Sequence, residues 1–305
     1  MFQKPTNAKP ENVQNNAINK RPKTYRRSIL VSLNKRIIPG FAALILFFSA
    51  LPAASLDTVV IKSKAMGSKP KAVVVVPDSY NQVKDYFPVL YLLHGWSGTF
   101  QDWPDHIDLR PLSDRYQMII VCPDGGYAGW YLDSPIQKES QYETYLSQEV
   151  LRYIDKHYRT VADAEGRFIC GLSMGGHGAV RMLAKHPELY AAAGSMSGVL
   201  ALTATGKKYG IVQLIGPSED YPERWAEYSC LNLVDTLAGL NKGLIVDCGI
   251  DDFTIDVNRE MHKQLMELGI FHDYYERPGG HSWDYWANAL EYHIIYFVKF
   301  RKNQK

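Results

Sequence analysis

The chain has 305 residues, of which 46% are hydrophobic and 22% are charged, a composition ordinary for a globular protein with a sizeable core. Its formal net charge is +2, and much of the basic excess lies in the first 36 residues, which leaves a mildly acidic remainder. A nucleic-acid-binding protein needs a basic face on its folded part, so the charge distribution argues against that class.

The amino-terminal segment comes first and resembles an export signal. Residues 1–36 form a basic lead without a hydrophobic period, so we expect no fold there. Residues 37–51 are apolar, about as long as a signal-peptide core and too short to span a bilayer comfortably. The small residues 53–55 form a cleavage site before Leu56. We therefore predict a lead at 1–36, a signal-like segment at 37–55, one folded domain at 56–305, and export to the periplasm or the cell exterior. A membrane tether is expected only if the segment stays uncleaved.

Eight short β-type runs then alternate with helical patterns. Several runs are continuous and β-branched, as expected for strands buried on both faces of a parallel sheet. Apolar stripes predict helices at 143–158, 174–186, 255–268 and 283–300. The alternation indicates a doubly wound α/β fold, with a mostly parallel sheet and helices on both faces. The eight runs are 58–62, 72–77, 88–93, 118–123, 167–170, 191–195, 244–248 and 271–277.

Two regions interrupt this alternation. Residues 123–142 form a long loop rich in Gly, Tyr and Trp. Residues 199–242 separate two strands by more than a simple crossover needs, and we interpret them as a small helical insert over the site. The four cysteines are Cys122, Cys170, Cys230 and Cys248. Three of them end apolar runs, which predicts buried free thiols, and no Cys/His cluster suggests a metal.

The central motif is Gly171-Leu172-Ser173-Met174-Gly175, between a strand-like run and a helix-like segment. This context is the one required of a nucleophile elbow in an α/β-hydrolase. A turn this sharp crowds both neighbours of the serine, which favours glycine on either side. The alternative interpretation is a glycine-rich turn that serves only close packing of helix and strand.

A serine hydroxyl needs a base, and the base needs an acid that orients it, in the chain order Ser, acid, His. His281 lies in a glycine-rich loop between the last strand and the last helix, which suits a base. For the acid, Asp251 and Asp252 both follow the strand 244–248, and the pattern of residues leaves the choice open. We expect the other aspartate to cap the helix that begins near Thr254.

The developing oxyanion needs backbone donors. The run 88–93 ends in a turn at His94-Gly95-Trp96, which is where a hydrolase contributes one donor. We assign the donors to the N–H groups of Trp96 and Met174. His94 precedes the serine in the chain, and we expect it to shape the turn.

At these residues the chain resembles the esterase family that includes S-formylglutathione hydrolase, tributyrin esterase, feruloyl esterases and the antigen 85 mycolyltransferases. The matching stretches are VLYLLHGWSG, VCPDGG, FICGLSMGGHGA, CGIDDF and RPGGHSWDYW, within residues 58–300. In that family the acid follows the glycine of the CG segment by three residues, so the resemblance selects Asp252. It also implies His281 as the base, and neither a metal nor an organic cofactor.

The expected substrate is a small-molecule or polysaccharide ester. An exported enzyme is better placed to hydrolyse acetyl or feruloyl esters on plant xylan than to hydrolyse a thioester in the cytosol. Loop aromatics at Trp96, Trp130, Tyr131 and Trp283 are candidates for the substrate rim, with loop packing as their alternative role. The rival functions are an acyltransferase of the mycolyltransferase type, a serine peptidase, and a non-catalytic carbohydrate-binding protein on the same scaffold.

Overall fold

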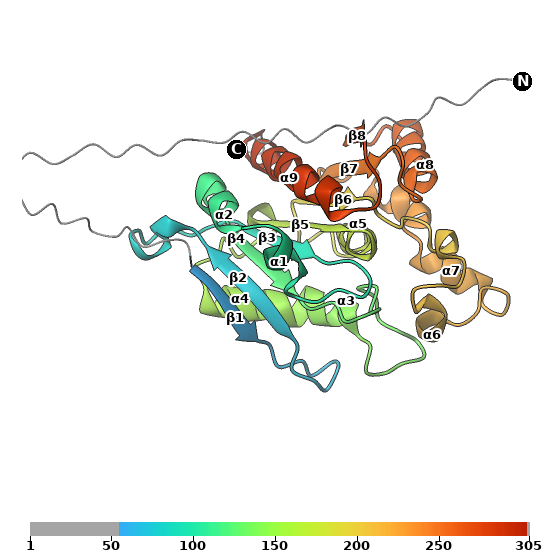
Figure 1. Cartoon of the computed structure of the whole chain (residues 1–305), viewed down its shortest axis with the longest axis horizontal. Coiled ribbons are helices and arrows are strands. Elements are labelled where there is room, and N and C mark those ends of the chain that lie inside the picture. Colours follow the sequence, from blue (N-terminus) through green and yellow to red (C-terminus); the bar gives the residue numbers. More distant parts are fainter. Residues whose placement is uncertain (1–54, 304–305) are drawn as a thin grey trace, which may run out of the picture. The chain divides into compact units, whose positions relative to one another are not determined.

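The computed structural model describes residues 55–303, in which eight strands form one sheet (Figure 1). The strand order is β1-β2-β4-β3-β5-β6-β7-β8; β2 pairs antiparallel with β1 and β4, and the remaining pairs are parallel. Every strand overlaps a predicted run, which confirms the mostly parallel α/β sheet. The strands are β1 Ser55–Val60, β2 Lys71–Val76, β3 Val89–Leu93, β4 Ile119–Pro123, β5 Arg167–Leu172, β6 Ala192–Met196, β7 Gly243–Gly249 and β8 Asp273–Arg277.

The central strands consist largely of apolar residues because both faces of the sheet are covered. Every residue of β3, β4 and β5 is buried. In β2, Val73 and Val75 belong to one apolar core, whereas Val74 and Val76 belong to the other. Alternation along a strand sends neighbouring side chains to opposite faces, so a continuous valine run supplies both cores.

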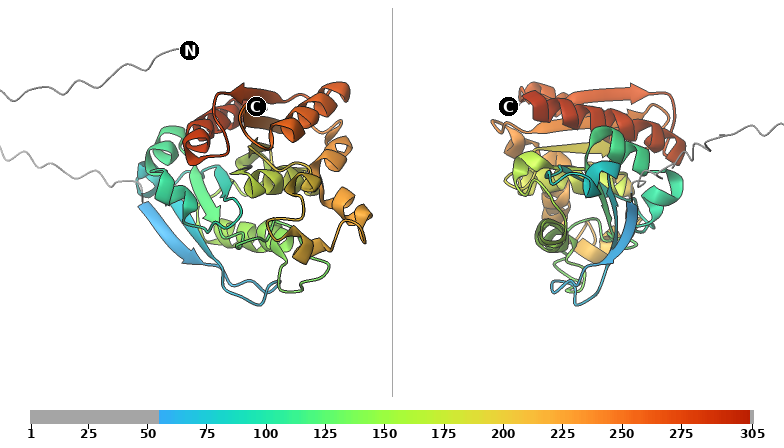
Figure 2. Two further views of the ribbon diagram at one scale, coloured as in Figure 1. Left: turned by 45° about the vertical axis from the view of Figure 1, so that its right-hand side comes forward. Right: turned by 90° about the vertical axis from the view of Figure 1, so that its left-hand side faces the viewer.

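Helices lie on both sides of the sheet (Figures 1 and 2). One core is completed by α1 Asp102–His106, α2 Arg110–Tyr116 and α9 Trp283–Asn303. The other is completed by α4 Leu151–His157, α5 Met174–Lys185 and α8 Ile255–Glu267. The predicted helix 143–158 consists of α3 Tyr142–Thr144, a π-helical stretch η2 Tyr145–Val150, and α4. Helices α1 and α2 are short, and sequence analysis did not predict them.

The predicted helical insert between β6 and β7 is present as four short helices. They are η4 Leu202–Thr205, α6 Ile211–Ile215, α7 Pro222–Tyr228 and η5 Cys230–Leu237. Trp225 anchors α7, because its ring is buried and its Nε1–H donates to the Gly216 carbonyl at 2.9 Å. His177 of α5 is 2.8 Å from the Tyr228 carbonyl through Nε2, which joins the insert to the helix behind the elbow.

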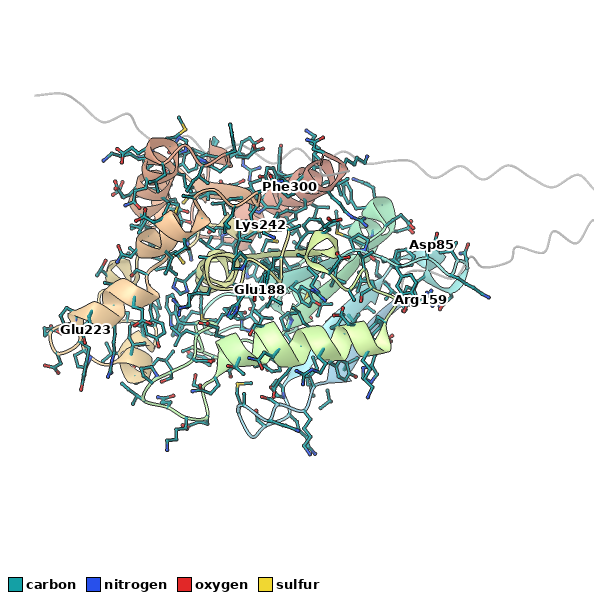
Figure 3. The ribbon with its side chains drawn as sticks, turned by 180° about the vertical axis from the view of Figure 1, so that it is seen from behind. Asp85, Arg159, Glu188, Glu223, Lys242 and Phe300 are labelled. Carbon is teal, nitrogen blue, oxygen red and sulfur yellow. The ribbon has the colours of Figure 1, made fainter. Side chains whose placement is uncertain are left out.

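Two side-chain contacts fix the amino-terminal end of β7. Lys242 donates to the Tyr190 carbonyl at 2.9 Å, and Phe300 of α9 packs beside Gly243 (Figure 3). The carboxyl ends of the parallel strands are where open α/β sheets bind ligands. The remaining short helices are η1 Asp78–Asn81 and η3 Ala164–Gly166.

The four cysteines are free and buried, as predicted. The lead 1–36 and the signal-like segment, apart from Ser55, lie outside the described residues. Between residues 55 and 303, no helix is both long and apolar enough to cross a membrane.

Candidate active site

Three loops at the carboxyl ends of parallel strands bring the predicted Ser, Asp and His together. Ser173 follows β5, Asp252 lies after β7, and His281 lies between β8 and α9. The Nε2 atom of His281 is 2.9 Å from Ser173 Oγ, and its Nδ1 atom is 2.9 Å and 3.0 Å from the two carboxylate oxygens of Asp252. A proton on Nδ1 satisfies Asp252 and leaves the Nε2 lone pair to accept the serine hydroxyl.

The turn at Ser173 requires glycine on either side. Ser173 has φ 53° and ψ −114°, and α5 begins at the next residue. A Cβ atom on Gly175 would lie 2.5 Å from the Leu93 carbonyl oxygen, and one on Gly171 would lie 2.6 Å from the Gly175 carbonyl carbon. Any side chain at these positions would push α5 away from β3, so the two glycines set the position of the serine.

The structure separates the two aspartates that sequence reasoning left open. Asp252 is buried and faces His281, whereas Asp251 is exposed and its N–H donates to the Gly279 carbonyl at 2.9 Å. Asp252 also accepts the N–H and the hydroxyl of Thr254, at 2.9 Å and 2.8 Å. One carboxylate therefore both orients the base and caps the turn before α8, two tasks that sequence analysis divided between the aspartates.

These contacts keep Asp252 ionised. Burial raises the pKa of a carboxyl group, but hydrogen bonds and charge from His281, together with the Thr254 N–H, outweigh burial and hold the pKa of Asp252 below its ordinary value. An ionised carboxylate beside Nδ1 stabilises a positively charged imidazole.

The two proposed oxyanion donors lie beside the serine. Met174 is the first residue of α5, and the amides of a first helical turn have no carbonyl partner within their helix. On the other side, a Cβ atom on Gly95 would lie 3.6 Å from Ser173 Cβ, so the turn that carries Trp96 packs against the elbow.

His94 holds that turn. Its Nε2 atom accepts the Gly125 N–H at 2.8 Å, and its Nδ1 atom is 2.8 Å from the Gly95 carbonyl oxygen. These two bonds fit the tautomer with the proton on Nδ1. Both ring nitrogens are thereby used within the loop framework, which is the role that sequence analysis gave this residue.

A cavity of about 500 Å³ opens onto Ser173 and His281. Trp130 and Trp283 line it, as expected of rim candidates. Tyr131 does not, and its assignment to the rim was wrong: its ring packs beside Gly125 and Gly178, and its hydroxyl donates to the His94 carbonyl at 3.1 Å. The other lining residues are Gly95, Trp96, Ser97, Asp102, Leu172, Val199, Tyr209, Phe253, Ser282 and Trp286.

Sequence reasoning missed three of the aromatic lining residues. Trp286 follows Trp283 at helical spacing, and Phe253 directly follows the acid, so both positions carried a usable signal. Tyr209 lies in the insert, and nothing in its local pattern indicates that it faces the cavity. Over the described residues, no cluster of three or more His, Cys, Asp or Glu side chains is arranged to hold a metal ion.

The chain is similar to esterases of known sequence and structure. Residues 63–297 match the family described as "Putative esterase". An esterase of Mycobacterium tuberculosis is 33% identical over 251 residues, which cover 72% of this chain and 54% of that protein, so the match spans about half the relative's length. An acetyl esterase of Caldicellulosiruptor saccharolyticus is 31% identical over 228 residues, 67% of this chain and 82% of that protein. A ferulic acid esterase of known structure is 31% identical with a TM-score of 0.72, over 81% of this chain and 98% of that one.

Proposed function

This chain belongs to the esterase family, and from that membership we propose that it is a serine carboxylesterase that works through an acyl-enzyme. The observation that carries the proposal is the pair of contacts made by His281, 2.9 Å to Ser173 Oγ through Nε2 and 2.9 Å to Asp252 through Nδ1. This geometry matches the nucleophile, base and orienting acid of serine hydrolases.

In the first half of the reaction, Ser173 Oγ attacks the ester carbonyl carbon while His281 Nε2 takes the hydroxyl proton. Asp252 stabilises the resulting imidazolium, and the N–H groups of Trp96 and Met174 bind the oxyanion. His281 then gives the proton to the departing alkoxide, which leaves as an alcohol. In the second half, water attacks the acyl-enzyme with His281 again as the base, and the free serine returns.

The proposed substrates are acetyl or feruloyl esters of carbohydrates. The cavity supports this choice because it is rich in aromatic side chains yet also carries hydroxyl and carboxylate side chains. The names of two relatives, an acetyl esterase and a ferulic acid esterase, point to the same acyl groups. A panel of acetyl, butyryl and feruloyl esters, including acetylated xylan, tests the proposal; higher turnover of the butyryl ester than of both others would contradict it.

Ser173→Ala is the decisive variant. Loss of the nucleophile should lower the turnover of p-nitrophenyl acetate by about 10⁴-fold or more, and should abolish labelling by a fluorophosphonate, with an unchanged circular dichroism spectrum. Ser218→Ala, in the insert and outside the cavity, is the matched control and should retain both activities. Turnover by Ser173→Ala at the wild-type rate would refute the assignment. If the wild type is labelled and does not hydrolyse the ester but transfers its acyl group to an added sugar, the protein is an acyltransferase.

We further propose that the protein is exported. Support comes from the apolar run 37–51 and the small residues before Leu56. Amino-terminal sequencing of the protein from the cells that produce it tests this proposal. We expect a mature chain that begins at Leu56. A chain in the cytosolic fraction that still begins at Met1 would contradict the proposal.

A further inference from the structure

His281 contacts two aromatic rings of the cavity wall. The centroid of the Phe253 ring lies 4.5 Å from that of the imidazole, and the centroid of the Trp286 ring lies 4.9 Å from it with the two rings nearly perpendicular. Both rings line the cavity. The imidazole that must protonate the leaving alkoxide therefore contacts one member of each of two sets of lining side chains, which differ in chemistry.

The first set, here called the insert half, is apolar. It comprises Trp96, Trp130, Val199, Tyr209 and Phe253. Tyr209 joins its members: its ring lies 5.1 Å from Trp96 and 6.5 Å from Phe253, and its carbonyl accepts the Trp130 Nε1–H at 2.9 Å. None of these five side chains carries a charge, so this half suits an apolar acyl group.

The second set, here called the α1 half, is polar at the cavity mouth. It comprises Ser97, Asp102, Ser282, Trp283 and Trp286. Ser97 and Ser282 are exposed, and Asp102 is half-buried. Helix α1 is fixed against this wall because the His106 ring stacks on Trp283 at 3.8 Å and Trp103 meets the same indole edge-on at 5.1 Å.

Asp102 belongs to this wall, and among the described residues one of its carboxylate oxygens accepts no hydrogen bond. Its Oδ1 atom accepts the Thr99 N–H at 2.9 Å. Its Oδ2 atom lies over Gly98, where a Cβ atom would overlap with it, so a glycine at 98 makes room for the carboxylate. No hydrogen bond between residues 55 and 303 ends on Oδ2. A carboxylate oxygen has more than one lone pair and readily accepts hydroxyl donors.

We propose that the α1 half binds the alcohol part of the ester, and that Asp102 selects alcohols that carry several hydroxyl groups by accepting their hydrogen bonds at Oδ2. The inference rests on the proposed function, and it places the acyl group of the ester substrate in the insert half. Asp102 is thus a specificity-determining residue. It favours an ester whose alcohol part is a neutral sugar, and its negative charge disfavours an ester whose alcohol part is anionic.

The test is a comparison of four esters with the full-length chain. Ferulic acid and acetic acid are each esterified to methanol and to a pentose, and kcat/KM is measured for the wild type and Asp102→Asn. Because a hydrogen bond to a charged acceptor is a strong one, we expect Asp102→Asn to lower kcat/KM about tenfold for both pentose esters and less than twofold for both methyl esters. Asp105→Asn, exposed on the same helix and outside the cavity, is the matched control and should change none of the four.

Each other pattern of results overturns the inference. Equal losses on methyl and pentose esters would mean that Asp102 supports the fold or the turn 98–102. A loss that follows the acyl group would place the acyl group in the α1 half. Unchanged kcat/KM for all four esters would remove Asp102 from recognition. The proposed function fails separately, through absence of hydrolysis and of fluorophosphonate labelling in the wild type.

Discussion

At the scale of single residues, the site depends on which of two neighbouring carboxylates faces the base. Asp252 contacts His281 Nδ1 and is held by Thr254, whereas Asp251 is exposed. Asp252→Asn should lower kcat by about 10³- to 10⁴-fold because the amide no longer favours the required tautomer or stabilises the imidazolium. Asp251→Asn should change kcat less than twofold. Steady-state hydrolysis of p-nitrophenyl acetate by both variants measures this, and a larger loss in Asp251→Asn would move the acid by one residue.

The same residues show which parts of the site could be predicted from the sequence. Ser173 and His281 could be predicted because their glycine-rich surroundings are unusual in composition and have a fixed order along the chain. The choice between Asp251 and Asp252 needed either a resemblance or coordinates, since adjacent side chains in a loop point in different directions. Tyr131 was misassigned for that reason: its neighbour Trp130 faces the cavity, whereas Tyr131 turns toward Gly178 of α5.

At the scale of elements, the elbow depends on the close approach of β3, β5 and α5. Gly175→Ala places a methyl group 2.5 Å from the Leu93 carbonyl oxygen. Because a backbone atom cannot yield as a side chain does, α5 must shift, and we expect at least a hundredfold loss of esterase activity, since small misplacement of a catalytic group is costly. Activity and urea unfolding of the same preparation measure the effect.

Gly269→Ala separates this effect from general backbone strain. Gly269 has φ +66° with no atom within 4 Å of an added Cβ, so alanine there should cost about 1 kcal/mol of unfolding free energy and leave activity intact. Comparable activity losses in the two variants would mean that general backbone strain, and not displacement of the elbow, lowers the activity.

Elements differed in how well they could be predicted, and the difference follows from burial. The central strands β3, β4 and β5 are short runs covered on both faces, so each leaves a nearly continuous apolar signal. Helices α1 and α2 have five and seven residues and begin without a side-chain cap, which leaves too few residues to show a period. The insert was predicted only as a helical region, because its four helices are equally short.

At the scale of the whole molecule, two buried histidines link stability to pH. Burial lowers the pKa of His177 to about 4 and that of His293 to about 3. An unfolded chain binds protons at histidine near its ordinary value of about 6.5. The unfolded state therefore takes up more protons as the pH falls below 6.5, so the contribution of both groups is complete above that pH and is lost as the pH falls to about 4 for His177 and about 3 for His293. Between pH 7 and 5, each histidine should remove about 2 kcal/mol of unfolding free energy.

His293→Leu isolates one of these two groups. His293 lies in α9 against Gly194, and neither ring nitrogen has a partner, so an apolar side chain removes a buried polar group as well as a titration. In urea unfolding at several pH values, the unfolding free energy of the variant relative to that of the wild type should rise by about 2 kcal/mol as the pH is lowered from 7 to 5. Phe297→Leu, in the same core and without a titrating group, should lower stability equally at every pH. If the His293→Leu and wild-type curves stay parallel, the imidazole is not held neutral, and acid unfolding begins elsewhere in the fold.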